Sequence, residues 1–246
     1  MLIINADDYG GWESATNAAL EGFKHRRISS VTAMVYMADS ERAAALAKEA
    51  GMSVGLHLNL DTPFTSNDCP EELRSLQGPV RRWLRFNKYA QVIYNPFVQS
   101  NIEKLYQTQI SEFKRLYGRG PSHIDGHHHL HLCANMLGGK VIPFREKIRQ
   151  CFSLWPGEKN FINRLYRKRV AKQIASRYIT TEYFFALSQC FKPERLARIE
   201  ELAIISNVEI MTHPEHAQEY NWLMSDFAEK TFSKLELGSF DQLKSL

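Results

Sequence analysis

The chain has 246 residues, a formal net charge of +4, 44% hydrophobic residues and 24% charged residues. These values are typical of a soluble globular protein, and we expect no nucleic-acid partner, because binding would need a broader basic surface than this chain has. The length suits an α/β barrel, so we expect residues 1–246 to form a single domain. No apolar run is long enough to span a membrane, the acids at positions 7 and 8 come too early for a signal peptide, and the four scattered cysteines suggest free thiols. We therefore expect a cytoplasmic protein with no membrane span.

Two acids follow the first predicted strand. The short apolar run 2–4 ends at polar residues that include Asp7 and Asp8, which predicts a buried strand with both acids at its carboxyl end. In a regular strand the two side chains would point to opposite faces, so both reach one site only if the chain bends, as Gly10 and Gly11 would permit. The alternative is that Asp8 merely turns the chain.

Alternating strand and helix patterns follow. We expect a helix over 15–24, a strand over 30–37, a helix over 40–50 and a third strand over 53–60. His57 lies on the third strand, on the face opposite its apolar residues, although a lone strand histidine is more often a core residue. Residues 61–120 form a long insertion before the next strand, as expected for a lid or a substrate-binding element.

The segment from His123 to His131 holds five of the nine histidines and Asp125 within nine residues. As an extended segment it would place alternate residues, including Asp125 and His127, on one ligand-rich face. As a helix it would pair His127 with His131, but without the glutamate of a helical zinc-protease motif. The preceding turn at 118–121 favours a short strand entering the core.

Later elements are less regular. The pattern predicts helices over 140–149, 160–176 and 194–204, a strand over 180–185, and a weaker strand over 151–154. A last strand, over 207–212, ends in His213, which His216 follows. We expect a solvated face for the basic helix 160–176.

The polar groups expected at strand ends suggest a metal site. They come from separate strands, which is the distribution of an active site at the mouth of a parallel barrel. Two histidines and one carboxylate leave coordination positions open, as in a hydrolytic divalent-metal centre, and a spare aspartate and histidine could serve as base and acid. The candidates are Asp7, Asp8, His57, Asp125, His127 and His213.

Three segments resemble the signatures of the YdjC-like carbohydrate deacetylases, a family that includes chitooligosaccharide and hopanoid-associated deacetylases. They are Asn5-Ala6-Asp7-Asp8-Tyr9-Gly10, Gly55-Leu56-His57-Leu58-Asn59-Leu60 and His123-Ile124-Asp125-Gly126-His127-His128-His129-Leu130-His131. Their order and rough spacing match the family, and Met211-Thr212-His213-Pro214 extends the resemblance over most of the chain.

The resemblance implies an α/β fold, a distorted (β/α) TIM-like barrel. It also implies an enzyme that removes an acetyl group from an N-acetylated sugar or oligosaccharide. It implies a divalent metal, Mg or Zn first and Mn or Co as alternatives, held by Asp8, His57 and His127. By the same resemblance Asp7 is the general base and His213 the acid, and a homodimer is expected. Asp125 is then expected to orient a ligand histidine or Asp7.

The chain also departs from the family pattern. Residues 11–13 and the tail after Glu215 differ from the usual sequence, which affects substrate choice and tail docking but leaves the metal ligands unchanged. An amidohydrolase or phosphoesterase acting on another small molecule, and a sugar-binding module without turnover, are the alternatives. Roles for His128, His129, His131 and His216 are left unassigned.

Overall fold

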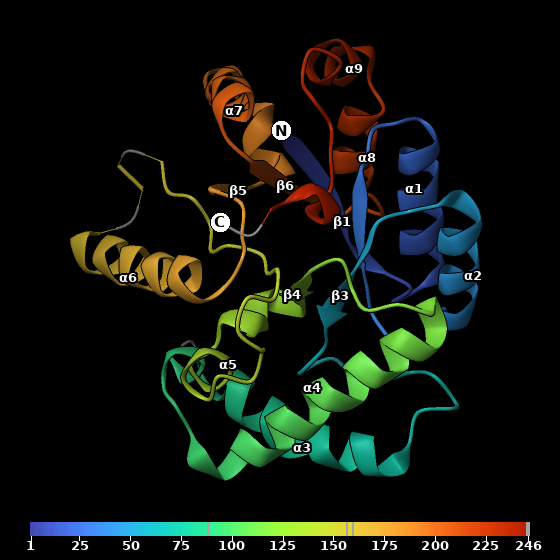
Figure 1. Ribbon diagram of the computed structural model, residues 1–246, viewed down its shortest axis with the longest axis vertical. Helices are drawn as coiled ribbons and strands as arrows, with labels where there is room; N and C mark the ends of the chain where they lie inside the picture. The colour runs from blue at the N-terminus through green and yellow to red at the C-terminus, as the bar shows by residue number, and fades with distance from the viewer. Residues whose placement is uncertain (88, 156, 159, 245–246) are drawn as a thin grey trace.

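A six-stranded parallel sheet forms the centre of the molecule in the computed structural model, which describes residues 1–87, 89–155, 157–158 and 160–244 (Figure 1). The strands lie in the order β4-β3-β2-β1-β6-β5, and every pairing is parallel. All carboxyl ends therefore meet at one edge. The strands are β1 (Leu2–Tyr9), β2 (Ser30–Ala33), β3 (Val54–Leu58), β4 (Ile124–Gly126), β5 (Tyr183–Ala186) and β6 (Val208–Thr212).

Helices cover the outside of this sheet. The strands β1, β2 and β3 are buried along their whole length, as expected for parallel strands with both faces covered. Figure 1 shows α1 and α2 along one side and α7 beside β6. The helices are α1 (Glu13–Lys24), α2 (Ser40–Ala50), α3 (Glu71–Phe86), α4 (Pro96–Tyr117), α5 (Ala134–Gly138), α6 (Phe161–Arg177), α7 (Pro193–Ile205), α8 (Ala217–Leu223) and α9 (Asp226–Phe232).

The sheet curls but does not close as a regular barrel within the described residues, so the structure is a partial TIM-like barrel. Irregular chain spans the gap between β4 and β5. Ile148 forms an isolated bridge with Ile124 of β4, and the amide of Ser153 donates to the carbonyl of Phe184 in β5 (2.9 Å). The prediction of a distorted TIM-like barrel is therefore confirmed as a curled parallel sheet that forms a partial barrel.

The predicted insertion after the third strand is the helical pair α3 and α4. Helix α4 begins where the side chain of Asn95 accepts a hydrogen bond from the amide of Phe97, and it ends at Gly118, whose φ of 69° is left-handed. The two helices pack against one another below β3 and β4 in Figure 1. Helix α6 instead projects from the sheet and is mostly exposed, as expected for the basic helix.

Two predicted elements are wrong. Residues 140–149 form turns and bridges instead of a helix, and 151–154 contain no strand. Arg149 explains part of the first error, because its backbone pairs with Ile124 and its side chain is completely buried. The four cysteines are free, and no helix in the described part of the chain has the length and apolarity needed to cross a membrane.

Candidate metal centre at the carboxyl ends of the strands

A bend in β1 brings both adjacent acids into the interior. Asp8 has a left-handed φ of 59°, and the register between β1 and β2 shifts between Ala6 and Tyr9. The amide of Gly11 donates to the Asp8 carbonyl (2.9 Å), which closes the turn. The predicted bend thus lies at Asp8 itself, and Asp7 and Asp8 are both buried. A non-glycine residue in this conformation is strained, and such strain concentrates at functional sites.

Asp8, His57 and His127 form a compact cluster. Asp8 Oδ1 lies 3.1 Å from His57 Nε2 and 2.8 Å from His127 Nδ1, and one ligand atom from each residue lies within 4.8 Å of the others. Burial opposes ionisation of Asp8, but hydrogen bonds from the two histidines outweigh it and hold the pKa of the carboxyl well below its usual range. One carboxylate and two imidazoles with nearly converging ligand atoms fit a divalent ion with open coordination positions.

Asp125 orients His57 from behind. Its Oδ1 lies 2.7 Å from His57 Nδ1, which leaves Nε2 facing Asp8, and Thr32 Oγ1 donates to its Oδ2 (3.0 Å). Burial disfavours the charged imidazole, yet Asp125 and Asp8 outweigh that effect and raise the pKa of His57 well above its usual range. A carboxylate behind a histidine fixes the ring and its tautomer, which is the arrangement expected for a metal-ligating histidine.

Arg149 binds Asp7 through both carboxylate oxygens. Nη1 and Nη2 each lie 2.6 Å from an oxygen of Asp7, and the side-chain amide of Asn5 donates to Oδ1 of the same carboxylate (3.0 Å). Burial raises the pKa of Asp7, but the Arg149 guanidinium outweighs it and holds the pKa well below the usual range. Asp7 is therefore ionised at neutral pH and firmly positioned beside the cluster.

The same arginine joins two further carboxyl groups. Arg149 Nη1 lies 2.7 Å from Asp125 Oδ2, and Nε lies 2.7 Å from Glu209 Oε1. Arg149, Asp125 and Glu209 are all fully buried. Burial raises the pKa of Glu209 to about 8 although Arg149 acts in the opposite direction. One guanidinium thus links the predicted base, the residue behind His57 and a carboxyl group in β6.

Sequence reasoning missed Arg149 and Glu209. Arg149 was assigned to a predicted helix, where an arginine is unremarkable. Glu209 carried a stronger signal, because a glutamate inside a short apolar strand of a parallel sheet needs a buried partner.

His213 lies at the rim of the cluster. Its Nε2 is 3.8 Å from Asp8 Oδ2, and its side chain is 25% exposed. Glu219 of α8 holds the backbone there, since its Oε2 accepts from the His213 amide (2.7 Å) and from Thr212 Oγ1 (2.8 Å). A partly exposed imidazole beside the cluster can reach both a bound molecule and solvent.

The short strand expected at the start of the histidine run is β4, but the extended alternative, with one ligand-rich face over 123–131, does not hold. β4 ends at Gly126, and residues 127–132 form a 3₁₀ segment in which His128 and His129 have left-handed φ values of 53° and 57°. A Cβ on Gly126 would lie 2.8 Å from the His131 amide nitrogen, so the tight turn requires glycine. Of the alternate residues, only His127 belongs to the cluster, and Asp125 contacts it through His57.

Three other histidines of this run, His123, His129 and His131, pack against neighbouring groups. His123 stacks on Phe240 at 3.7 Å between ring centroids, and His131 Nε2 lies 3.2 Å from the Arg149 carbonyl. Burial lowers the pKa of both rings well below the usual range. His129 contacts Phe152 with 4.7 Å between ring centroids, and burial lowers its pKa to about 3. The three rings are therefore neutral at physiological pH; His123 and His131 are buried, and His129 is half-buried.

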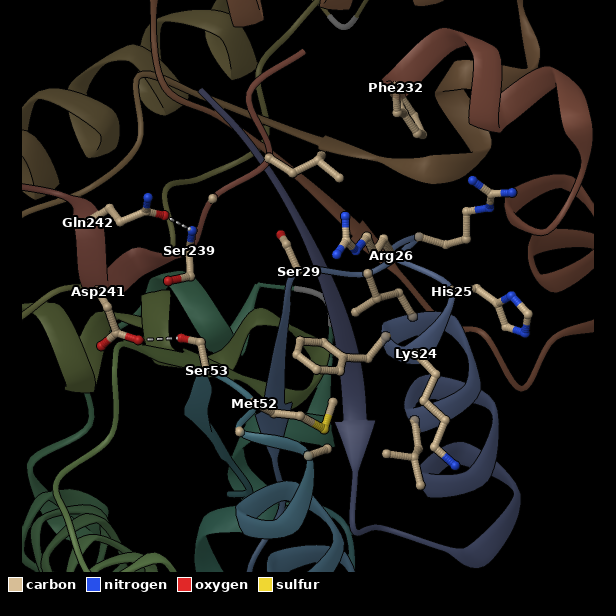
Figure 2. Close-up of a pocket in the computed structure, with 18 of the residues that line it drawn as sticks. Lys24, His25, Arg26, Ser29, Met52, Ser53, Phe232, Ser239, Asp241 and Gln242 are labelled. Atoms are coloured by element: carbon tan, nitrogen blue, oxygen red, sulfur yellow. Dashed lines mark hydrogen bonds between the residues drawn. The ribbon is translucent and has the colours of Figure 1, made fainter. Parts of the chain in front are cut away.

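A large groove lies at the opposite ends of the strands. It has a volume of about 1260 Å³, and its walls include Ser29 and Ser53, which precede β2 and β3 (Figure 2). Ser53 donates to Asp241 there (2.6 Å), and Lys24 and Arg26 lie at the end of α1 (Figure 2). None of the predicted site residues lines this groove. The size of a cavity therefore does not identify the candidate metal centre. The carboxylate and imidazole side chains at the carboxyl ends of the strands identify it.

The fold and the cluster together define a class: a parallel α/β protein whose strand ends carry a carboxylate and two histidines able to hold a divalent ion. The chain belongs to the YdjC-like protein family, whose model matches residues 1–237.

Named relatives are similar over most of their length. A chitooligosaccharide deacetylase of Serratia marcescens is 29% identical over 220 residues, covering 87% of this chain and 81% of the relative. A carbohydrate deacetylase of Halalkalibacterium halodurans is 26% identical over 246 residues, covering 96% and 94%. A crystal structure from Enterococcus faecalis V583, provisionally named a cellobiose-phosphate cleavage protein, matches with a TM-score of 0.68 at 18% identity, covering 98% and 97%. That last likeness supports the fold alone.

Proposed function

We propose that this protein is a metal-dependent hydrolase that removes the acetyl group from an N-acetylated carbohydrate. The observation that carries the proposal is the cluster of Asp8, His57 and His127 with the ionised Asp7 beside it. The family and the names of its deacetylase relatives supply the substrate class. No further partner is needed for this reaction, since water and the sugar acetamide are its only substrates.

A divalent ion, Mg²⁺ or Zn²⁺ in the first instance, would be held by Asp8, His57 and His127, where it would acidify water and polarise the acetamide carbonyl. Asp125 keeps the His57 ring turned toward Asp8 through its 2.7 Å contact with Nδ1. Arg149 supports this arrangement because it binds Asp125 as well as Asp7.

Asp7 accepts the proton from the attacking water at one of its carboxylate oxygens. Arg149 keeps Asp7 ionised and fixed, and a fixed acceptor avoids the entropic cost of ordering during the reaction. A carboxylate with a lowered pKa is a weak base toward bulk water. This role therefore requires water whose own pKa is lowered, as a bound divalent ion would do.

His213 donates a proton from its imidazole to the departing nitrogen. Its place at the rim, 3.8 Å from Asp8 and partly open to solvent, lets the ring regain its proton after each turnover. The balance is complete: water oxygen bonds to the acetyl carbon, the C–N bond breaks, and the products are acetate and the amino sugar. In each turnover Asp7 gains one proton from water and His213 gives one to the nitrogen, and both groups return to their starting states by exchange with solvent.

Acetate release from N-acetylglucosamine oligomers and other acetamido sugars tests the proposal. The purified protein is assayed as prepared, after chelation, and after return of each metal. We expect acetate that disappears with the chelator and returns with metal. Absence of acetate under every metal, with sugar binding retained, would contradict deacetylation and favour a binding module. Activity on a phosphoester or another amide instead would favour the alternative hydrolase.

A further inference from the structure

A second group of metal-ligand side chains lies next to the first. It consists of Asp61, His127 and His128, which each offer one ligand atom within 4.8 Å of the others. Asp61 follows β3 and His128 follows β4, so two neighbouring strands present the group at the same edge as the first cluster. His127 belongs to both groups.

The contacts inside this group match those of the first. His128 Nδ1 lies 3.2 Å from Asp61 Oδ1 and 3.1 Å from Oδ2. Two ligands bound at about 2.1 Å in a tetrahedral site lie roughly 3.4 Å apart, so an ion can be accommodated with small adjustments of these side chains. The direct carboxylate–imidazole contact here has the same form as Asp8 with His57 and His127.

Local backbone and side-chain support hold the group in place. His128 has a left-handed φ of 53°, and its ring packs on His127 with 4.0 Å between centroids. The Asp61 side chain is only 5% exposed, and Arg85 Nε of α3 holds its Oδ2 at 2.8 Å. The backbone conformation at His128 and the contact from Arg85 to Asp61 hold these two side chains in fixed positions. The pair is therefore preorganised, unlike a mobile ion pair on the surface.

Exposure differs between the two groups. The His128 side chain is 52% exposed and that of His127 is 13% exposed, whereas His57 is 2% exposed. The second group therefore opens to solvent, and the first lies deeper. An ion from solution can meet the exposed His128 ring first, next to the buried Asp61 carboxylate.

We propose that Asp61, His127 and His128 form a second divalent-cation site, selective for ions that accept imidazole such as Zn²⁺, and weaker than the first. Two imidazoles and one carboxylate suit Zn²⁺ better than Mg²⁺, which prefers oxygen ligands. The site is weaker for two reasons. His127 can hold both ions only through its two ring nitrogens, so the second ion must displace the remaining ring proton to solvent, and the Arg85 guanidinium is a neighbouring positive charge. The inference rests on the proposed function only through this shared histidine.

Zn²⁺ binding measured by calorimetry, with bound metal counted after dialysis against a defined free concentration, tests the second site. The wild-type chain should bind one ion tightly and a second more weakly. Asp61→Asn and His128→Gln should keep the tight ion and lose the weak one, with a fall in affinity beyond the roughly 10- to 100-fold that removal of a supporting group costs. The His128 side chain is half exposed, so that variant provides a folded test even if Asp61→Asn is unstable.

Matched controls are available on the surface. Asp68→Asn and His25→Gln change exposed residues of the same types outside both groups, and both variants should bind two ions. One ion in the wild type, unaffected by Asp61→Asn and His128→Gln, would overturn the second site. Loss of the tight ion in those variants but not in Asp8→Asn would place the principal ion at Asp61 instead and contradict the first assignment. Acetate release is not part of this readout, so failure of the proposed function is judged separately.

Discussion

Replacing Arg149 with methionine tests the buried charge network most severely. Arg149 contacts Asp7, Asp125 and Glu209 at 2.6–2.7 Å, and no member of this group is more than 2% exposed. Methionine fills similar space but provides no charge, so three buried carboxyl groups lose their shared cation. Removing one partner of a buried ion pair costs about 3–5 kcal/mol, and we expect a loss at least in that range near neutral pH.

The loss should depend on pH in a defined direction. Without Arg149, no guanidinium opposes the effect of burial on Asp7 and Glu209, so we expect their folded pKa values to rise above the unfolded ones. Stability from such groups is present at low pH and is lost as pH rises through the folded pKa values. The deficit of Arg149→Met should therefore shrink when the buffer is changed from neutral to about pH 5.5.

Urea unfolding with a chelator present measures both effects, because it removes any contribution of bound metal to stability. The free energies of unfolding of wild type and variant are compared at the two pH values. Equal unfolding midpoints at neutral pH, or a deficit that grows on acidification, would refute the argument that Arg149 neutralises these carboxyl groups.

Three other substitutions give separate tests. Asp7→Asn should lower acetate release by at least about 100-fold, because the acceptor of the water proton is lost, while bound metal is unchanged; loss of the metal would count against the base assignment. Glu209→Gln should be tolerated near neutral pH, because the pKa of Glu209 is about 8 and glutamine mimics its protonated form. Stability from that carboxyl is lost as pH rises from its ordinary value of 4.5 through 8, so urea midpoints of the variant should fall less over this range than those of wild type. Gly55→Ala should destabilise the protein by about 1–3 kcal/mol in thermal unfolding, since a Cβ would lie 2.5 Å from the His123 ring and 2.8 Å from its carbonyl oxygen; an unchanged melting temperature would show that His123 can move away.

Short-range sequence patterns predicted the parts of the site that lie at strand ends. Apolar runs that stop at a polar residue are local signals, and parallel pairing then brings those ends together. For this reason the sequence alone places Asp8, His57 and His127 near one another. Their roles as metal ligands remain a proposal.

The remaining parts depend on long-range packing. Arg149 lies 142 residues from Asp7 in the chain, and nothing near it in sequence shows that the two side chains meet. The histidine run was misread because alternation assumes a regular strand, whereas left-handed backbone at His128 and His129 redirects the chain. In the described part of the chain the sheet stays a partial barrel, because residues 147–153 pass from β4 to β5 with isolated bridges instead of a strand.

Acetate release measured against bound metal, in a single preparation, tests the central claim most directly. Metal-free protein is titrated with one ion, and activity and tightly bound metal are measured at each step. The account predicts that activity rises from zero in proportion to the first ion bound, and that Asp8→Asn neither binds this ion nor releases acetate. Full activity in the metal-free protein, or an Asp8→Asn variant that keeps both metal and turnover, would contradict it.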